Sequence, residues 1–398
     1  MIRITNYADC CGCTACASIC AHKAITMKAD ALGFFYPEVD ETKCVECGLC
    51  EKVCEFHPHY DLSDNLPEPE AYVGRHKDIE HVHKSQSGAA FIPISDYILN
   101  LGGVIYGAGF DKLFRVTHKR ALTTQERDEF RGSKYVQSDL NGVFQQVKQD
   151  LKAGKTVLFS GTPCQTAGLK SFVGKRMREN LVLVDLVCHG VGAPNLWRDY
   201  LDLLERRQKE KLSAVTFRDK KYGWQSHVET LHFTHGKTMG KRIFATLYAW
   251  RFALRKSCGI CPYCNTRRPS DLTIADFWGK DNAATKFCQD NKGCSMVFVN
   301  TEKGRTIWDT IRKEHPFKLI PAENCIQPNL LQPTVLPSQS EQFEKDYVTL
   351  GLEAALRNYG LAGWHLRLRE TGRILRESFF RKIPRSVKNQ IKRKITSK

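Results

Sequence analysis

Two cysteine motifs of identical spacing open the chain. The run Cys-x2-Cys-x2-Cys-x3-Cys begins at Cys10 and recurs at Cys44, with every cysteine displaced by 34 positions. A loop of this spacing directs three thiolates to three iron corners of a [4Fe–4S] cube, while the fourth cysteine binds the other cluster of the pair. The duplication therefore predicts two [4Fe–4S] clusters rather than zinc sites. The predicted ligands are Cys10, Cys13, Cys16 and Cys54 for the first cluster, and Cys44, Cys47, Cys50 and Cys20 for the second.

A third group of cysteines lies further along the chain. The motif Cys258-x2-Cys261-x2-Cys264 has no fourth cysteine at the ferredoxin spacing, so it needs a remote ligand or leaves one of its own thiols unused. The candidates are Cys164 and Cys188, each directly after a predicted strand and therefore expected at one edge of a sheet. The ligand rules favour a third [4Fe–4S] cluster, with a structural zinc site or unliganded thiols as the alternatives.

Three loops have the composition of a site for phosphates and a ring system. The loop Ser85-Gln86-Ser87-Gly88 precedes a predicted helix, and it offers hydroxyls and free backbone N–H groups at the helix N-terminus to an anion. The run from Arg131 to Tyr135 adds two cations and an aromatic ring, and Gly161-Thr162 follows a predicted strand. Helix capping and solvated turns explain the same residues. A Rossmann site is not supported, because no G-x-G-x-x-G motif with a following acidic residue is present.

These motifs, in their order along residues 72–340, resemble the coenzyme F420 hydrogenase/dehydrogenase beta-subunit family. The segments that carry the resemblance are Ser87-Gly88, Tyr106–Ala108, Arg131–Tyr135, Gly161–Gln165, Cys188–Gly190, Phe217–Trp224, Ser257–Tyr263 and Asp271–Gly279. The resemblance implies an iron–sulfur oxidoreductase that binds FAD. It also implies that Cys164, Cys188, Cys258 and Cys261 hold a cluster beside the flavin, whereas Cys264 lies outside this pattern.

The resemblance also implies a set of cofactor-binding residues. They are Ser87, Gly88, Ser133, Lys134, Tyr135, Gly161, Thr162, Pro163, Gln165 and Asp276. Asp276 is either a polar group near the flavin or a structural turn residue. Flavin chemistry needs no protein nucleophile, so no catalytic residue is assigned.

The expected activity is electron transfer that ends on an organic molecule. A redox donor, such as a ferredoxin or a partner subunit, would reduce the clusters, which would pass single electrons to FAD and on to an organic acceptor, deazaflavin-like or other. The alternative is a non-catalytic electron-transfer subunit that serves a separate partner enzyme. The sequence does not identify the substrate.

The elements that must position these residues follow from hydrophobic patterning. Predicted helices at 87–100, 140–152 and 194–209 alternate with buried strands at 104–106, 156–159 and 181–187, which favours a layered α/β core. Segments 214–218 and 227–234 read as an antiparallel pair, so a mixed sheet is expected. The predicted fold is a small ferredoxin-like α+β domain, with strands at 24–27 and 33–37, then this flavin-binding core and a C-terminal helical tail.

Composition and charge set the domain organisation. The 398 residues are 42% hydrophobic and 26% charged, as in a soluble globular protein of several domains. Prolines 58, 67 and 69 mark a linker after the cysteine repeats. The predicted units are a 2[4Fe–4S] domain at 1–60, a linker at 61–84, the two parts of the flavin domain at 85–175 and 176–350, and a basic helical tail at 351–398.

The net charge of +17 is concentrated at the C-terminal end. Residues 365–398 carry 12 Lys and Arg against two Glu, and their only Phe, Trp or Tyr residues are Phe379 and Phe380 and not a series interleaved with the cations, so nucleic-acid binding is not expected. The tail either packs on its own core or makes peripheral contact with an anionic membrane or an acidic partner. No apolar run is long enough for a membrane span and no signal peptide is visible, so a cytoplasmic location is expected.

Overall fold

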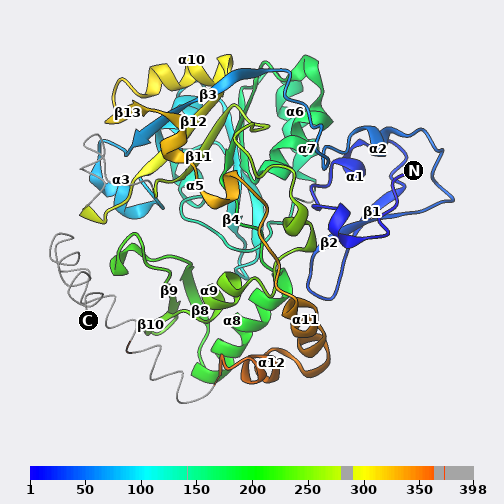
Figure 1. The fold of residues 1–398 in the computed structure, drawn as a ribbon, viewed down its shortest axis with the longest axis vertical. Coiled ribbons are helices and arrows are strands. Elements are labelled where there is room, and N and C mark those ends of the chain that lie inside the picture. Colours follow the sequence, from blue (N-terminus) through cyan, green and yellow to red (C-terminus); the bar gives the residue numbers. More distant parts are fainter. Residues whose placement is uncertain (141, 279–289, 363–371, 373–398) are drawn as a thin grey trace.

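The structure is a computed structural model that describes residues 1–140, 142–278, 290–362 and 372. Three regions are visible in Figure 1: an N-terminal head that contains the cysteine repeats, a large sheet with helices on both faces, and a smaller lobe of strands and helices. The fold is therefore mixed α/β after a ferredoxin-like head.

The head shows the sequence duplication as a structural repeat. Each cysteine loop leads into a short helix, α1 (Ala15–Ile19) or α2 (Leu49–Lys52). The N-cap residues Thr14 and Gly48 occupy equivalent places, and both have left-handed backbone, with φ of 67° and 71°. Between the two loops, the predicted strand pair is confirmed, as β1 (Ile25–Ala29) and β2 (Phe35–Val39) form an antiparallel ladder.

The large sheet has eight strands and is mixed, as predicted. In spatial order the strands are β13 (Phe317–Ile320), β3 (Asn65–Gly74), β12 (Ser295–Thr301), β11 (Leu272–Asp276), β7 (Leu181–Leu186), β6 (Val157–Gly161), β4 (Val104–Phe110) and β5 (Val116–Ala121). β4, β6, β7 and β11 are parallel neighbours, and the strands outside them pair antiparallel. The carboxyl ends of the parallel strands therefore lie at one edge of the sheet.

Alternate residues of the central strands fill two separate cores. Ile105 and Leu158 pack toward α4 (Phe91–Asn100) and α10 (Glu302–Ile311). Val104 and Phe159 pack on the opposite face, toward the helices α6 (Val143–Lys152) and α7 (Pro163–Val173). Because both faces of the parallel strands are covered, their sequences read as continuous apolar runs.

The segment 61–84, expected to be a linker, instead contains β3, which lies between β12 and β13, and α3 (Ile79–Lys84). The prolines that suggested a linker, Pro67 and Pro69, fall where the register between β3 and β12 shifts. There the partner of Thr301 is Asn65 and that of Val299 is Glu70. Proline is tolerated at such a bulge, so the strand continues beyond it.

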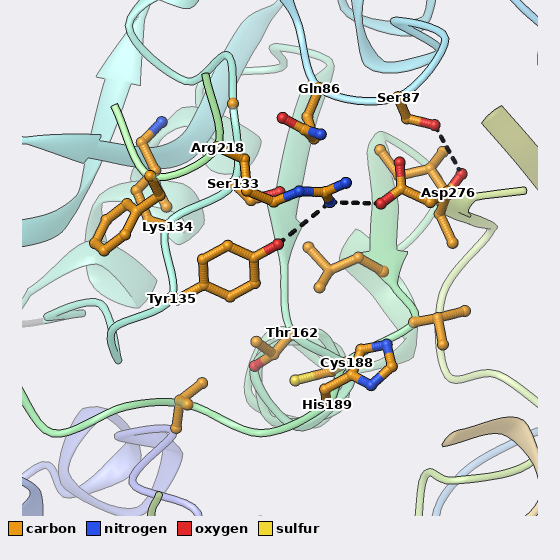
Figure 2. A pocket seen from close by; sticks show the side chains of 18 of the residues that line it. Gln86, Ser87, Ser133, Lys134, Tyr135, Thr162, Cys188, His189, Arg218 and Asp276 are labelled. Atoms are coloured by element: carbon orange, nitrogen blue, oxygen red, sulfur yellow. Dashed lines mark hydrogen bonds and ion pairs between the residues drawn. The ribbon is translucent and has the colours of Figure 1, made fainter. Parts of the chain in front are cut away.

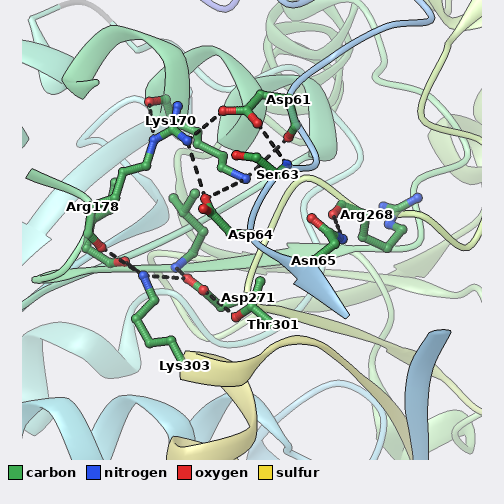
Figure 3. Close-up of polar contacts among 12 residues, drawn as sticks. Asp61, Ser63, Asp64, Asn65, Lys170, Arg178, Arg268, Asp271, Thr301 and Lys303 are labelled. Carbon is green, nitrogen blue, oxygen red and sulfur yellow. Dashed lines mark hydrogen bonds and ion pairs between the residues drawn. The ribbon is translucent and has the colours of Figure 1, made fainter. Parts of the chain in front are cut away.

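Polar contacts fix the start of this segment to the core (Figure 3). Arg178 donates to Asp61 Oδ2 at 2.6 Å, and the Lys170 ammonium lies 3.2 Å from Asp64 Oδ2. Asn65 Nδ2 donates to the carbonyl of Arg268 at 2.8 Å. The chain therefore passes from head to core as an anchored segment.

The smaller lobe confirms the predicted antiparallel pair. Its strands and helices are β8 (Leu212–Thr216), β9 (Glu229–Phe233), β10 (Thr238–Lys241), α8 (Pro194–Gln208), α9 (Ile243–Trp250), α11 (Gln339–Leu350) and α12 (Leu352–Asn358). Trp197, Phe217 and Phe244 meet in its core. A short helix, α5 (Thr124–Asp128), lies beside β5.

Most of the basic tail, 363–371 and 373–398, lies outside the described residues, so the prediction made for it stays a prediction. Among the helices that are described, none is both long and apolar enough to span a membrane.

One predicted helix starts later than expected. Ser87 and Ala89 have φ of 56° and 65°, which a right-handed helix does not accept, and α4 begins at Phe91. Ser87 and Gly88 therefore belong to a loop and do not form a helix N-terminus. The helices predicted at 140–152 and 194–209 are present as α6 and α8.

Candidate functional site

The four cysteines predicted to bind the first cluster line one small cavity in the head. Cys10, Cys13 and Cys16 come from the first motif, and Cys54 comes from the second. Burial raises the pKa of the Cys54 thiol to about 11. Burial disfavours the thiolate form, and a bound iron ion would compensate the negative charge of that thiolate. The structure brings the four thiols together, and their role as ligands stays a prediction.

The second predicted set lies nearer the surface. Cys50 and Cys20 pack with Ile25 in a small apolar cluster. Their sulfurs accept hydrogen bonds from the backbone N–H groups of Ile2 and Ala24, both at 3.3 Å. Cys47 of the same set is exposed to solvent.

Five cysteines from three distant segments form the third group. Cys164 is in the first turn of α7, Cys188 follows β7, and the motif that starts at Cys258 occupies η4 (Lys256–Ile260) and the turn after it. Burial raises the pKa of the Cys188 thiol, and Cys258, Cys164 and Cys264 raise it further by electrostatic repulsion. Thiols that repel one another in this way lie close together. The group has five cysteines, one more than the four that bind a [4Fe–4S] cube.

The geometry of these groups differs from that of a mononuclear site. Among the described residues, no three His, Cys, Asp or Glu side chains converge closely enough to hold a single metal ion. The thiolates of a cube lie further apart, because each binds a different iron.

A single buried thiol connects the first group with the third. The Cys11 thiol lies near those of Cys13 and Cys164, and these neighbours together with burial raise its pKa well above the ordinary value. The α7 backbone approaches the head closely at Gly168, where an added Cβ would lie 2.7 Å from Cys13 Sγ. The head therefore contacts the same helix that carries Cys164.

A large cavity of about 860 Å³ lies beside the third group. Its walls come from the carboxyl ends of β6, β7 and β11, from the loop 130–136 and from the loop before α4. Cys188 is part of its lining (Figure 2). This is the edge of a parallel sheet where α/β folds place their ligands.

An ion pair defines one wall of the cavity. Arg218 Nη1 lies 2.7 Å from Asp276 Oδ2 and 3.3 Å from the hydroxyl of Tyr135, as Figure 2 shows. Trp224 Nε1 donates to the other Asp276 oxygen at 2.6 Å. Asp276 is therefore held by two donors and cannot reorient freely.

Three polar atoms of the lining have no partner within the part of the chain that the structure describes. They are Ser85 Oγ, His118 Nδ1 and Arg131 Nε, all of them buried. His118 Nε2 donates to the carbonyl of Ser160 at 3.0 Å, so its Nδ1 is a bare acceptor. Burial lowers the pKa of His118 to about 4, which keeps the imidazole neutral. Unpaired buried polar atoms such as these are costly unless something else satisfies them.

A smaller basic cavity of about 470 Å³ adjoins the first and shares several lining residues with it. Its lining includes Lys84, Arg131, Lys134, Arg218 and Lys220, against only Asp128 and Asp219. Burial lowers the pKa of Lys134 and of Lys220 to about 7. An anion in this cavity would favour the charged form of both lysines.

Eight of the ten predicted cofactor-binding residues line the large cavity: Ser87, Ser133, Lys134, Tyr135, Gly161, Thr162, Gln165 and Asp276. Gly88 faces the sheet, where an added Cβ would lie 2.5 Å from the carbonyl of Gly74. Pro163 is buried in the first turn of α7. These two residues shape the backbone without lining the cavity.

Sequence reasoning found Ser85 as part of the loop before α4 but missed His118 and Arg218 as cavity residues. Arg218 belongs to a motif of the family resemblance, so a signal was present for it. His118 comes from β5, an antiparallel strand at the sheet edge, and no local pattern marks it.

Comparisons with known proteins agree with the residue motifs. Residues 154–324 match the family model for the C terminus of the coenzyme F420 hydrogenase/dehydrogenase beta subunit, and residues 9–57 match that for a 4Fe-4S dicluster domain. The predicted resemblance is therefore confirmed, and the head is an iron–sulfur domain. No curated protein matches the chain.

Among solved structures, the chain is similar to a chain from a xenon-derivatised F420-reducing [NiFe] hydrogenase complex of Methanosarcina barkeri. The TM-score is 0.44 and the sequence identity is 17%, with 74% of this chain and 92% of that chain covered.

Proposed function

We infer that this chain, an iron–sulfur protein related to the beta subunits of coenzyme F420 hydrogenases and dehydrogenases, is a flavin-dependent oxidoreductase. Single electrons enter the two clusters of the head, pass to a third [4Fe–4S] cluster, and reach FAD and then an organic acceptor. The observation that carries this proposal is the large cavity whose lining includes Cys188 of the third cysteine group.

The large cavity fits a flavin in size and polarity. Its volume of about 860 Å³ is within the usual range for cofactor sites, about 300–1,000 Å³. A flavin ring carries both donors and acceptors, as the unpaired atoms Ser85 Oγ, His118 Nδ1 and Arg131 Nε require. Bound there, a flavin would convert one-electron transfer into hydride chemistry.

The basic cavity suits the pyrophosphate of the same cofactor. Lys134 and Arg131 lie in the loop that borders both cavities, and Lys220 also lines the basic cavity. The Lys220 ammonium is fixed by the carbonyls of Val82 at 2.6 Å and Ser87 at 2.5 Å. Cations held in this way attract phosphate without having to reorganise.

The surrounding residues orient the ligand and exclude water. Neutral His118 offers an acceptor at the cavity wall, and its ring stacks on Phe159 at 4.9 Å, which fixes its plane. The Arg218–Asp276 pair presents a fixed dipole in the lining of the same cavity (Figure 2). Neither arrangement requires a nucleophile, in agreement with flavin chemistry.

Anaerobic analysis of iron, sulfide and flavin tests the proposal. We expect about twelve irons and one FAD per chain, because three cubes hold about four irons each. A protein that contains zinc and lacks iron would contradict the whole proposal. A protein with about eight irons and no flavin would contradict the third cluster and the flavin site.

A second candidate function is electron relay to a separate enzyme. The exposed Cys47 lies between Val45 and Leu49, which are 56% and 44% exposed, so the predicted second cluster is close to a surface that a protein partner can cover. Reduction of an added organic acceptor by the isolated, flavin-loaded chain supports the enzyme. Electron transfer that occurs only when a partner protein is present supports the relay.

A further inference from the structure

The side chain of Arg255 crosses from the core into the iron–sulfur head. Its Nε donates to the carbonyl of Cys10 at 2.8 Å, and Nη2 donates to the carbonyl of Phe35 at 2.9 Å. Nη1 donates to Gln137 Oε1 at 2.9 Å, and the Gln137 amide in turn donates to the carbonyl of Cys11. The guanidinium thus holds the cysteine loop of the first predicted cluster.

The charge of Arg255 is deeply buried. The residue is 1% exposed, and its guanidinium lies 4.1 Å from the ring centre of Tyr36 and 5.4 Å from that of Phe34. Gly12 allows this close approach, since an added Cβ would lie 2.9 Å from Nη1. Water and salt therefore screen the charge weakly.

No carboxylate pairs with Arg255 within the described residues. The other two fully buried arginines each have one: Arg127 lies 2.7 Å from Asp96, and Arg268 lies 3.3 Å from Asp185. The oxygens that Arg255 contacts are all neutral, whereas Cys10 Sγ lies 3.7 Å from Nη2. A buried cation without an anion is costly, so a negative charge at the cysteines would satisfy it.

A thiolate-ligated cube provides that negative charge. Its net charge becomes one unit more negative when it accepts an electron, and a nearby fixed cation stabilises the reduced form. The second predicted set has no comparable arginine in the described contacts, and its Cys47 is exposed. The two cubes of one duplicated motif are thus in different electrostatic surroundings.

We propose that Arg255 is a positioning residue that supplies the counter-charge of the first cluster and raises its reduction potential above that of the second. One electron then leaves the second cluster and reduces the first, and no bond forms or breaks. A low-potential one-electron donor then reduces the second cluster again. The onward contact to the third group is made where Gly168 of α7 lies against Cys13 and where the buried Cys11 thiol lies near Cys13 and Cys164. This inference deepens the electron route of the proposed function and rests on its ligand assignment.

Redox titration of the purified anaerobic holoprotein, followed by EPR, tests the inference. Arg255→Gln removes the charge, Arg255→Lys keeps it, and Arg267→Gln removes an exposed cation twelve positions further along the chain as a matched control. Cys47→Ser identifies the signal of the second cluster by perturbing it.

We expect Arg255→Gln to shift the electron-sharing equilibrium between the two head clusters at least tenfold toward the second, which is 59 mV for one electron. Arg255→Lys and Arg267→Gln should change it less than threefold. An unchanged equilibrium in Arg255→Gln overturns the inference, as does an equal shift in Arg255→Lys.

If Arg255→Gln does not retain the first cluster, Arg255→Lys decides the matter. An equilibrium within threefold of wild type supports the inference, and a tenfold shift overturns it. Failure of the proposed function is seen separately, as a missing flavin or a missing third cluster, and neither loss removes the two head signals that this titration measures.

Discussion

The polar residues that line the two cavities are of two kinds: some have hydrogen-bond partners among the described residues, and others have a polar atom without one. Asp276 is held by Arg218 and Trp224. His118 Nδ1 and Ser85 Oγ have no partner in the described part of the chain. A lining that combines fixed side chains with unpaired polar atoms is typical of a binding site that is formed before its ligand binds.

Removal of one cysteine at a time tests the third group. Cys258→Ala or Cys261→Ala should abolish the cluster beside the large cavity and leave the two head clusters, because both cysteines fit the spacing and the family pattern. Cys264→Ala should have a smaller effect. Iron content and EPR measure the result. Loss of a cluster in Cys264→Ala together with full retention in Cys258→Ala would show that the assignment is wrong.

Lys134 should make flavin binding dependent on pH. Its pKa in the free protein is lowered to about 7 by burial, and the phosphates of FAD favour its charged form. Affinity should therefore be constant below pH 7 and decrease above it, by at most about tenfold per pH unit for one linked proton. Fluorescence titration of FAD from pH 6 to 9 measures this dependence.

Two variants of Lys134 serve as controls for that titration. Lys134→Arg stays charged over the whole range, so its affinity should fall less steeply than that of the wild type between pH 7 and 9, with the titration of Lys220 remaining. Lys134→Met should bind more weakly at every pH and keep only the shallower pH dependence that Lys220 contributes. Equal slopes for wild type and Lys134→Arg would exclude Lys134 as the titrating group.

At the scale of elements, the site depends on parallel strands that end at the same sheet edge. β6 leads into the α7 turn with Cys164, β7 leads to Cys188, and β11 ends at Asp276. The sheet that aligns them also includes β3, from the segment expected to be a linker. A change that destabilises β3 should therefore also destabilise the core.

Val73 tests whether β3 is a structural strand. Its side chain is fully buried among Met296, Phe298 and Ile320, so Val73→Ala should lower the free energy of unfolding by about 2 kcal/mol. Glu68→Ala, at an exposed position of the same strand, should have little effect. Denaturant unfolding compares the two. Equal stabilities would mean that the segment behaves as a linker.

At the scale of the whole molecule, the head and the core share contacts at their cysteines. Arg255 reaches the head from the core, and Gly168 of α7 lies against Cys13. The core therefore contacts the head through residues that lie beside the first cysteine group. Figure 1 shows α1 of the head beside α7 of the core.

Gly168→Val should disturb this contact. A β-branched side chain would collide with Cys13, whose thiol cannot move away while it binds iron. We expect loss of about four irons per chain with an unchanged circular dichroism spectrum. Ser171→Val, on the half-exposed side of the same helix, should keep the full iron content. Full iron content in Gly168→Val would mean that the first cluster does not depend on the close contact between the head and α7.

Local sequence patterns were sufficient to predict the iron–sulfur head, the mixed α/β core and eight of the residues that line the large cavity. These features depend on local patterns: cysteine spacing within a loop, alternation of helices and strands, and glycine-rich or basic turns after strands. Ser133, Lys134 and Tyr135 were found in this way. Local patterns also produced the errors, since Pro67 and Pro69 suggested a linker, and Ser87-Gly88 suggested a helix N-terminus.

Only the tertiary structure decided which distant residues meet. Cys188 joins Cys258, His118 enters the large cavity from an edge strand, and Arg255 reaches Cys10 across 245 positions of sequence. Sheet order and the seating of the head produce these contacts. A pattern confined to one loop or strand carries no information about them, because burial and charge pairing depend on neighbours that are remote in the chain.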